Sequence, residues 1–354
     1  MTGGPHLDET AAAAAGPRAV GWRAPFRPAW WLPHRHLQTI WGRTFRRGPR
    51  VEMRREIRET PDGDVLELDH VDGPAGAPLL VALHGLEGCS QSLYMHGLLH
   101  RARARGWRGI AVNFRSCAAP PGRPRGEWVP NRAARMYHSG ETSDLGWLIE
   151  RLHEEEPGVP IVLAGVSLGG NVLLKWLGER GAEASPPVRA AAAISVPYDL
   201  ALGSRTLERG LGRVYVRFFL KTLKEKAIDF DRRWPGIVDV EAARRARTFW
   251  EFDDASVAPI HGFADAADYY ARSSSIDFLH RIEVPTLLIS AADDPFQPGD
   301  VFPRVRAAAS GAVTCLFTER GAHAGFVAGP PWAPRCWDED TAIAFLAERL
   351  KGPE

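Results

Sequence analysis

The sequence predicts an α/β protein with a mostly parallel central sheet that is covered by helices on both faces. Short apolar runs of strand length alternate along the chain with segments whose apolar residues recur at helical spacing. Before them, residues 52–71 alternate polar and apolar residues around the turn signal Pro61-Asp62-Gly63, which indicates a β-hairpin. Strands that alternate with helices form parallel sheets, because each crossover helix packs on a face of the sheet.

The elements after the hairpin follow this alternation closely. Apolar runs predict strands in segments 78–85, 109–115, 160–165, 189–197, 285–294 and 313–323. Helical spacing predicts helices at 92–106, 142–155, 169–180 and 338–350, the second with Thr142 as its N-cap. Between Asp199 and Ser275 the alternation gives way to a long, charge-rich helical insertion.

The chain divides into a tail, a main domain and this insertion. Residues 1–22 are rich in Ala, Gly and Pro, have little to pack, and are expected to form a flexible tail. The main domain then covers residues 23–354. The insertion, at about 199–275, follows a strand and is placed to roof a site at the carboxyl ends of the strands. An equally good interpretation is a second packing layer with no role at the site.

Composition excludes several classes of protein. With 45% hydrophobic and 25% charged residues, the 354-residue chain is globular, and its formal net charge of +1 argues against a nucleic-acid partner. No run reaches the ~18 apolar residues of a membrane span, and no signal pattern begins the chain, so the expected location is cytoplasmic. The four cysteines lie far apart, which favours free, mostly buried thiols over two disulfides. The oligomeric state stays open.

The stretch from Phe26 to Phe45 is unusual, because it holds three tryptophans among basic residues. Such a composition is typical of an interfacial membrane anchor. The favoured interpretation is a strap that crosses the main domain and buries its aromatic rings there, since two prolines prevent a long amphipathic helix. Peripheral membrane contact remains the alternative.

The strongest chemical signal is the motif Gly165-Val166-Ser167-Leu168-Gly169, which has the form G-x-S-x-G. A buried strand precedes it and a helix follows, as a nucleophile elbow requires. The turn is too sharp for side chains on both sides of the serine, so glycines flank it. We therefore expect Ser167 to be a nucleophile, although Gly-Ser-Gly clusters also form ordinary turns.

A serine hydroxyl needs an imidazole to take its proton and a carboxylate to orient that imidazole. After the strand in 285–294 come Asp293 and Asp294, and after the strand in 313–323 comes His323. Both loops should open at the same edge of the sheet as the elbow. The order Ser167, Asp294, His323 is the one expected of this kind of fold.

The reaction also needs backbone amides that receive an oxyanion. One is expected at Leu168, directly after the nucleophile, and the other at Leu86, in the His84-Gly85 turn after an early strand. His84 itself is expected to brace this loop and to have no chemical role.

No cofactor or metal is expected. His96 and His100 are spaced i, i+4 on one helix, but the glutamate of a zinc motif is missing, so a solvent-side pair is the favoured interpretation. The glycines form no phosphate-binding loop, because no G-x-x-x-x-G-K-[ST] motif is present.

Taken together, these motifs resemble the YheT-like (EMB8-type) branch of the α/β-hydrolase superfamily, which includes carboxylesterases and lipid hydrolases. The resemblance spans nearly everything beyond Pro33, and the block "YHSGETSD", Tyr137 to Asp144, is particularly diagnostic. It implies the α/β-hydrolase fold with a helical cap insertion and a charge-relay triad of Ser167, Asp294 and His323. One departure is Ala322, where the family usually has glycine, and this small change puts nothing catalytic in doubt.

The predicted function is that of a serine esterase, of the carboxylesterase or lipase kind. It would act through an acyl-enzyme on a small-molecule ester, lipid-like esters included, without metal or cofactor. Two alternatives stay open: an acyltransferase with the same triad, and a hydrolase-like binding protein that uses the pocket for recognition. Acyl-chain length depends on pocket shape, which the insertion largely sets.

Overall fold

The computed structural model describes residues 21–120, 127–184 and 186–351. Residues 1–20 of the predicted tail lie outside these ranges. Trp22, at the end of that tail, is buried against helix α12 (Trp337–Leu350). Its ring meets Phe345 edge-on, and its indole nitrogen donates to Glu348 at 2.7 Å. Trp22 therefore belongs to the folded domain, one residue before the predicted start.

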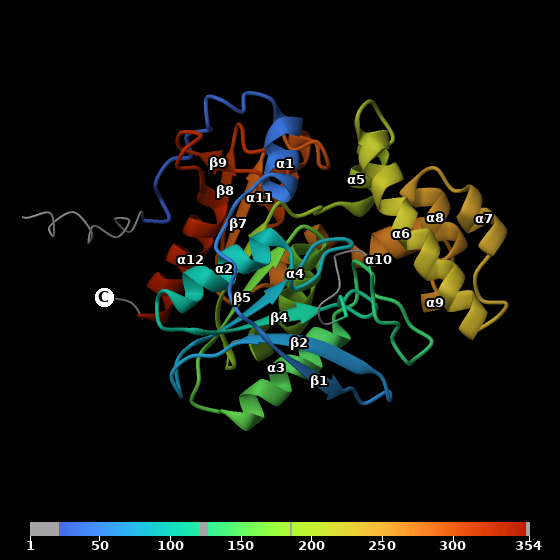
Figure 1. Ribbon diagram of the computed structural model, residues 1–354, viewed down its shortest axis with the longest axis horizontal. Helices are drawn as coiled ribbons and strands as arrows, with labels where there is room; N and C mark the ends of the chain where they lie inside the picture. The colour runs from blue at the N-terminus through green and yellow to red at the C-terminus, as the bar shows by residue number, and fades with distance from the viewer. Residues whose placement is uncertain (1–20, 121–126, 185, 352–354) are drawn as a thin grey trace, which may run out of the picture.

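An eight-stranded sheet forms the centre of the molecule, in the order β1-β2-β4-β3-β5-β6-β7-β8 (Figure 1). The hairpin strands β1 (Arg54–Glu59) and β2 (Val65–Val71) are antiparallel, and β2 pairs antiparallel with β4. The strands from β3 to β8 are parallel: β3 (Leu79–Leu83), β4 (Arg108–Asn113), β5 (Ile161–Val166), β6 (Val188–Ile194), β7 (Thr286–Ala291) and β8 (Val313–Thr318). The predicted mostly parallel sheet is confirmed.

Helices cover both faces of this sheet. On one face lie α2 (Leu93–Arg103) and α12; on the other lie α3 (Ser143–Glu155), α4 (Leu168–Arg180), η2 (Ser275–Arg281) and α11 (Phe302–Ala308). Alternate residues of β3 serve the two layers: Val81 packs into the core with α3 and α4, and Leu80 into the core with α2 and α12. Burial on both faces explains why the strands are continuous apolar runs.

Two details of these helices differ from expectation. Thr142 occupies the N-cap position of α3, but its hydroxyl donates to Glu179 at 2.6 Å and caps no helical amide. His96 is not on the solvent side: it is buried, and its Nδ1 accepts a hydrogen bond from the Val51 amide at 3.2 Å. Helical spacing alone could not show that the segment before β1 covers this face of α2.

The four cysteines are free, as expected, and three of them are buried.

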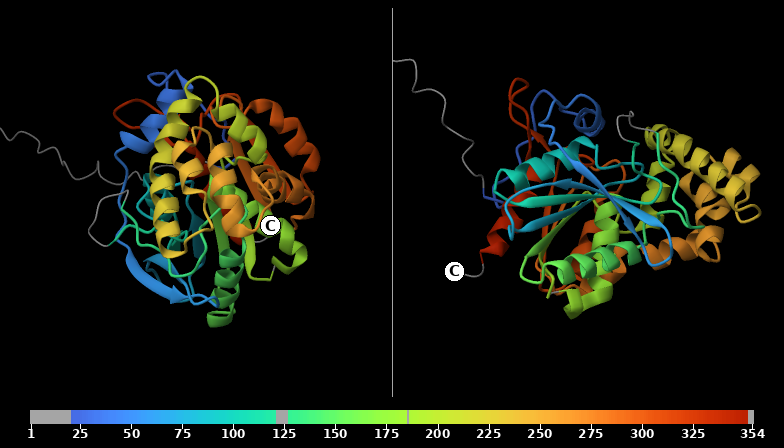
Figure 2. Two further views of the ribbon diagram at one scale, coloured as in Figure 1. Left: turned by 90° about the vertical axis from the view of Figure 1, so that its right-hand side faces the viewer. Right: turned by 60° about the horizontal axis from the view of Figure 1, so that its bottom comes forward.

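The insertion between β6 and β7 consists of helices with a hydrophobic core of their own. The helices are α5 (Leu200–Leu207), α6 (Gly212–Arg233), α7 (Val240–Arg245), α8 (Phe249–Ala255), α9 (Val257–His261) and α10 (Ala266–Ser273). Figure 2 shows them, in yellow to orange, projecting from one end of the sheet.

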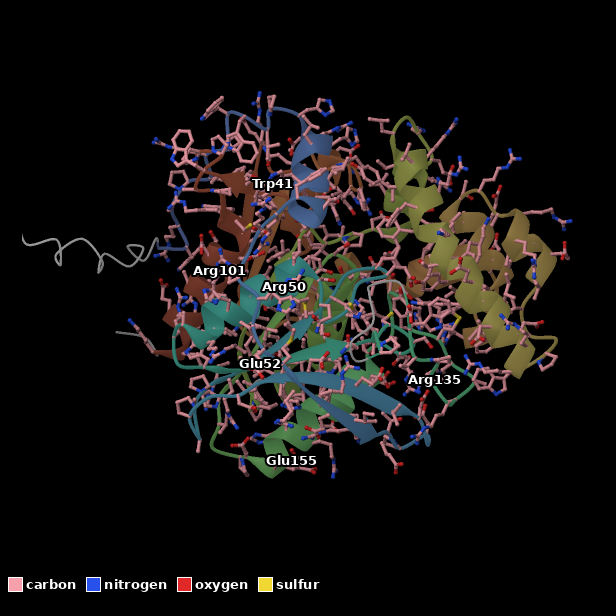
Figure 3. All side chains as sticks on the ribbon, viewed as in Figure 1. Trp41, Arg50, Glu52, Arg101, Arg135 and Glu155 are labelled. Carbon is pink, nitrogen blue, oxygen red and sulfur yellow. The ribbon has the colours of Figure 1, made fainter. Side chains whose placement is uncertain are left out.

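The Trp-rich stretch crosses the domain and forms one short helix, α1 (Arg35–Thr44). The Trp31 ring meets that of Trp41 edge-on, and its indole nitrogen donates to the Gly329 carbonyl at 2.9 Å (Figure 3). Trp30, by contrast, is 73% exposed. The stretch is thus a strap that leaves part of its aromatic surface uncovered. Among the described helices, none has the length and apolarity needed to cross a bilayer.

Buried ion pairs join α12 to α2 and to Arg46, the residue that follows the strap. Glu339 is 1% exposed and accepts hydrogen bonds from Arg46 at 2.8 Å and from Arg101 at 2.6 Å. Figure 3 labels Arg101. Its neighbour Asp338 is also buried, and its Oδ1 has no partner among the described residues. Burial, reinforced by the charge of Glu339, raises the pKa of Asp338 to about 8.

Asp338→Asn is expected to stabilise the protein increasingly as the pH rises from 5 to 8. The carboxyl pKa is higher in the folded chain than in the unfolded one, so wild-type stability falls as the pH rises from the unfolded pKa towards the folded one. The amide removes this loss, which is on the order of a few kcal/mol at pH 8. Urea unfolding at pH 5 and pH 8 measures it, and equal differences at the two pH values would contradict the assignment.

Candidate active site

Four loops meet at the carboxyl edge of the parallel strands. They follow β3, β5, β7 and β8, and Ser167 stands on the loop between β5 and α4. Ser167 has φ 55° and ψ −120°, a backbone conformation that L-residues rarely adopt. A Cβ on Gly165 would lie 2.5 Å from the Gly169 carbonyl oxygen, and a Cβ on Gly169 would lie 2.5 Å from the His84 carbonyl oxygen, so neither position has room for a side chain. The local sequence thus forces the serine into a sharp strand-to-helix elbow.

Three predicted side chains meet at this edge through hydrogen bonds. His323 Nε2 lies 3.0 Å from the Ser167 hydroxyl, and His323 Nδ1 lies 2.8 Å from Oδ2 of Asp294. Asp294 is 4% exposed. The Phe296 ring stacks on the imidazole, with centroids 4.0 Å apart and planes 11° apart. This stacking, which the sequence did not indicate, leaves the imidazole little freedom to turn away.

The neighbouring acid, Asp293, faces elsewhere. Its Oδ1 accepts a hydrogen bond from the Ala322 amide at 2.8 Å. Burial raises the pKa of Asp293, and the bond from Ala322 partly opposes that rise. Ala322 has φ 58°, a left-handed conformation that favours glycine and that this hydrogen bond helps to hold. Asp293 therefore supports the loop of His323 without touching its ring.

Two hydroxyls from distant parts of the chain also hold this loop. Ser195 Oγ accepts from the Ala324 amide at 2.8 Å, and Thr39 Oγ1 accepts from the His323 amide at 3.2 Å. Ser195 follows β6, whereas Thr39 lies on α1 in the strap. Neither residue carries a sequence signal, because the contacts join segments that are 129 and 284 residues apart.

The turn after β3 lies directly against the nucleophile. A Cβ on Gly85 would be 3.1 Å from the Ser167 Cβ. Within the described part of the chain, the amides of Leu86 and Leu168 have no hydrogen-bond acceptor, so both are available to a ligand. His84 is fully buried; its Nδ1 donates to the Gly85 carbonyl at 2.8 Å, and its Nε2 accepts from the Phe114 amide at 3.1 Å.

The protonation of His84 fits these two contacts. Burial lowers the pKa of its imidazole to about 4, so the ring is neutral at neutral pH. A neutral ring donates through one nitrogen and accepts through the other, as the two bonds require. The expectation that His84 braces the loop agrees with this geometry.

Glu87, the next residue of the turn, links the site to the insertion. Lys226, on α6, donates to Oε1 of Glu87 at 2.7 Å, and both side chains are nearly buried, with 5% and 6% exposed. The Glu87 amide donates to the Tyr137 hydroxyl at 3.0 Å, and that hydroxyl donates to Oε1 at 2.6 Å. Burial alone would raise the pKa of Glu87, but Lys226 lowers it, so the pair is ionised. Glu87 has φ 51°, and these contacts hold that unfavourable conformation.

The rest of the block that contains Tyr137 connects the nucleophile helix to the insertion. Asn171, on α4, donates to the Ser139 carbonyl at 2.9 Å. The Ser139 amide in turn donates to the hydroxyl of Tyr269, on α10, at 2.9 Å. The diagnostic block thus organises the loops around the site. In the described ranges, no three His, Cys, Asp or Glu side chains are grouped as metal ligands would be.

Lys226→Met is expected to destabilise the fold by about 3–5 kcal/mol, because it leaves the buried Glu87 carboxylate without its cation. Urea denaturation measures this loss. Lys221→Met, at an exposed position of the same helix, is the matched control and should change stability by less than about 0.5 kcal/mol. Adding Glu87→Gln to Lys226→Met should recover part of the loss. Equal stabilities of the two lysine variants would contradict the role of the pair.

Comparison with known proteins agrees with the fold. A family model described as the alpha/beta hydrolase fold matches residues 78–330. YheT of Escherichia coli strain K12, whose name assigns it provisionally to the esterases, is 40% identical over 333 residues, which cover 93% of this chain and 94% of YheT. The phospholipase ABHD3 of Mus musculus is 29% identical over 92% of this chain and 78% of its own. A solved esterase of Pyrococcus furiosus, 17% identical, superposes with a TM-score of 0.50 over 77% of this chain and 84% of that one, which supports the fold alone.

Proposed function

Because the chain belongs to the α/β-hydrolase family, in the branch that contains YheT, we propose that it is a serine hydrolase that cleaves carboxylic esters through an acyl-enzyme. One observation carries the proposal: the unbroken hydrogen-bonded row from Asp294 through His323 to Ser167. An imidazole placed between a carboxylate and a serine hydroxyl is the arrangement that activates a serine as a nucleophile.

Each step of the proposed reaction uses an atom placed by this geometry. Ser167 Oγ attacks the ester carbonyl carbon while His323 Nε2 takes the hydroxyl proton. The tetrahedral intermediate then collapses, the C–O bond to the alcohol breaks, and His323 returns the proton to the leaving oxygen. Water then attacks the acyl carbon while His323 Nε2 takes its proton. The second tetrahedral intermediate collapses, His323 returns the proton to Ser167 Oγ, and the carboxylic acid is released. Asp294 keeps the Nδ1 proton in place and stabilises the imidazolium.

The amides of Leu168 and Leu86 are proposed to bind the oxyanion of both tetrahedral intermediates. Leu168 follows the nucleophile directly in the chain, and Leu86 follows Gly85, which lies against the Ser167 side chain. Neither amide has an acceptor among the described residues. Loss of one such donor typically lowers kcat by ~10²–10³. The Glu87 contacts support this assignment, because they fix the turn that holds the Leu86 amide.

Substrate class is proposed from the relatives and from the insertion. Mouse ABHD3 is named a phospholipase, so lipid-like esters are the proposed substrates beside simple ones. The insertion, residues 199–275, is proposed to select acyl-chain length, because its α6 reaches the oxyanion turn through Lys226.

The four free cysteines support a reducing, cytoplasmic location.

A panel of nitrophenyl esters of graded chain length, run beside monoacylglycerols and phospholipids, tests the proposal. We expect hydrolysis of at least the short esters, with a preference among chain lengths. Product analysis with added alcohol separates hydrolysis from the acyl transfer that the same residues could perform. Absence of turnover on every ester, with tight binding of one of them, would favour a binding protein and overturn the proposal.

A further inference from the structure

Exposed apolar side chains gather at one edge of the molecule. Among the described residues, seven of the eight large apolar side chains that are at least half exposed lie in three segments. These segments are the strap, the start of α6 and the turn between β9 (Val327–Ala328) and β10 (Arg335–Cys336). The seven side chains are Trp30, Leu37, Phe45, Leu211, Val214, Phe218 and Trp332. We call this surface the docking face.

The three segments form one continuous surface. The strap pairs with β9, because the Ala29 amide donates to the Val327 carbonyl at 2.8 Å. On its other side, α1 meets α6, where His36 Nδ1 lies 3.0 Å from the Tyr215 hydroxyl. In Figure 1 the β9 region, α1 and the start of α6 follow one another along the upper edge, and Figure 2 shows the same neighbourhood from two other sides.

Basic residues predominate in two of these segments, the strap with its flanking residues and the start of α6. Residues 21–50 contain seven arginines and no Asp or Glu, and residues 209–221 contain four Lys or Arg and no Asp or Glu. Arg35, Arg213 and Arg217 are exposed beside the apolar side chains. Since the whole chain has a formal net charge of only +1, the remainder carries a net negative charge. Exposed basic and exposed apolar side chains therefore lie side by side in the strap and at the start of α6.

We propose that the docking face binds the surface of a bilayer that contains anionic phospholipids. Exposed Trp, Phe and Leu side chains enter the boundary between headgroups and acyl chains, and neighbouring arginines bind the lipid phosphates. A second copy of the chain fits this face poorly, because two such faces would bring like charges together. Nucleic acid would use the arginines but leave the apolar side chains in water.

Docking in this orientation places the proposed active site next to the lipid. Thr39, on the same helix as Leu37, accepts from the His323 amide. Tyr215 packs against Phe296, with ring centroids 4.9 Å apart, and Phe296 stacks on His323. An ester in the bilayer would reach Ser167 from the edge that the docking face surrounds. Binding to vesicles does not depend on the proposed reaction.

Vesicle flotation with the full chain tests the proposal. The probes are vesicles of phosphatidylglycerol and phosphatidylcholine in equal parts, and vesicles of phosphatidylcholine alone. The wild-type protein and Ser167→Ala should both float with the anionic vesicles, less so at 0.5 M salt, and weakly with the neutral ones. Val214→Glu and Trp332→Glu should each lower the affinity roughly tenfold or more, and Arg213→Glu should do so for anionic vesicles in particular.

Ile57→Glu is the matched control, because Ile57 on β1 is 59% exposed but lies outside the docking face. It should float as the wild type does. The four surface variants, at Val214, Trp332, Arg213 and Ile57, should keep wild-type unfolding curves and wild-type rates on a short, dissolved ester. Failure of the wild type to bind anionic vesicles, or equal losses in Ile57→Glu, would overturn the proposal. So would a change of sedimentation coefficient in Val214→Glu, which would identify the face as a contact between copies of the chain.

Discussion

Ser167→Ala is expected to lose nearly all ester hydrolysis while the protein folds as before. The hydroxyl is the atom that lies 3.0 Å from His323 Nε2, and alanine leaves that imidazole with no nucleophile to deprotonate. Residual activity should not exceed the ~10³–10⁴-fold enhancement over water that binding and the oxyanion amides can supply. Initial rates on a short nitrophenyl ester, together with a thermal unfolding curve, measure both parts of this prediction.

A matched serine shows whether the loss is specific. Ser143→Ala, at an exposed position at the start of α3, should keep the wild-type rate. If Ser167→Ala retained more than about a tenth of wild-type activity with its fold intact, another residue would have to be the nucleophile.

The two adjacent acids are expected to give opposite phenotypes when each is changed to asparagine. Asp294→Asn should lower kcat by as much as ~10⁴ and keep the fold, because an amide can hold the wrong imidazole tautomer. Asp293→Asn should keep the rate, because its Oδ1 serves the Ala322 amide and an asparagine oxygen can still accept that bond. Its cost in stability should be no more than about 1 kcal/mol, the scale of a lost neutral hydrogen bond.

Steady-state kinetics and urea unfolding of both variants decide the assignment. The contrast is sharp because the two residues are adjacent and chemically identical, so a general effect of charge would appear in both. An exchange of the two phenotypes would make Asp293 the relay acid and would contradict the geometry at His323.

The elements that could be predicted from sequence are those with a local cause. Strands buried on both faces must be continuous apolar runs, so the strands in residues 78–85 and 160–165 could be predicted from local sequence, and their alternation with helices predicts the parallel sheet. The elbow was readable because Gly165 and Gly169 stand where a side chain would strike the backbone. The positions of Asp294 and His323 followed because parallel strands end at one edge of the sheet.

The contacts that support the site could not be predicted, since each joins segments far apart in the chain. Glu87 and Lys226 are 139 residues apart, and nothing in the helical spacing of α6 marks one lysine among several as buried. The same limit explains His96. Helical spacing predicts that it faces solvent, but the segment before β1 covers it. The stacking of Phe296 on His323 likewise depends on how two loops approach one another.

The docking face could be predicted from the sequence only in part. The absence of acids from residues 21–50 is visible in the sequence, but the overall charge of +1 conceals it. Only the fold brings that segment beside α6 and leaves apolar side chains of both exposed. The strap interpretation and the membrane alternative are therefore compatible, because one face of the strap packs and the other faces solvent.

Labelling with a fluorophosphonate tests the central claim most directly, because the reagent reacts with serines that a neighbouring imidazole activates. Intact-mass and peptide mass spectrometry would count the adducts and locate them. We predict one adduct per chain, on Ser167, which forms slowly in Asp294→Asn and is absent from the heat-unfolded protein. An adduct on Ser139 or Ser195 would contradict the account. So would ester hydrolysis that persists after saturating treatment with the reagent.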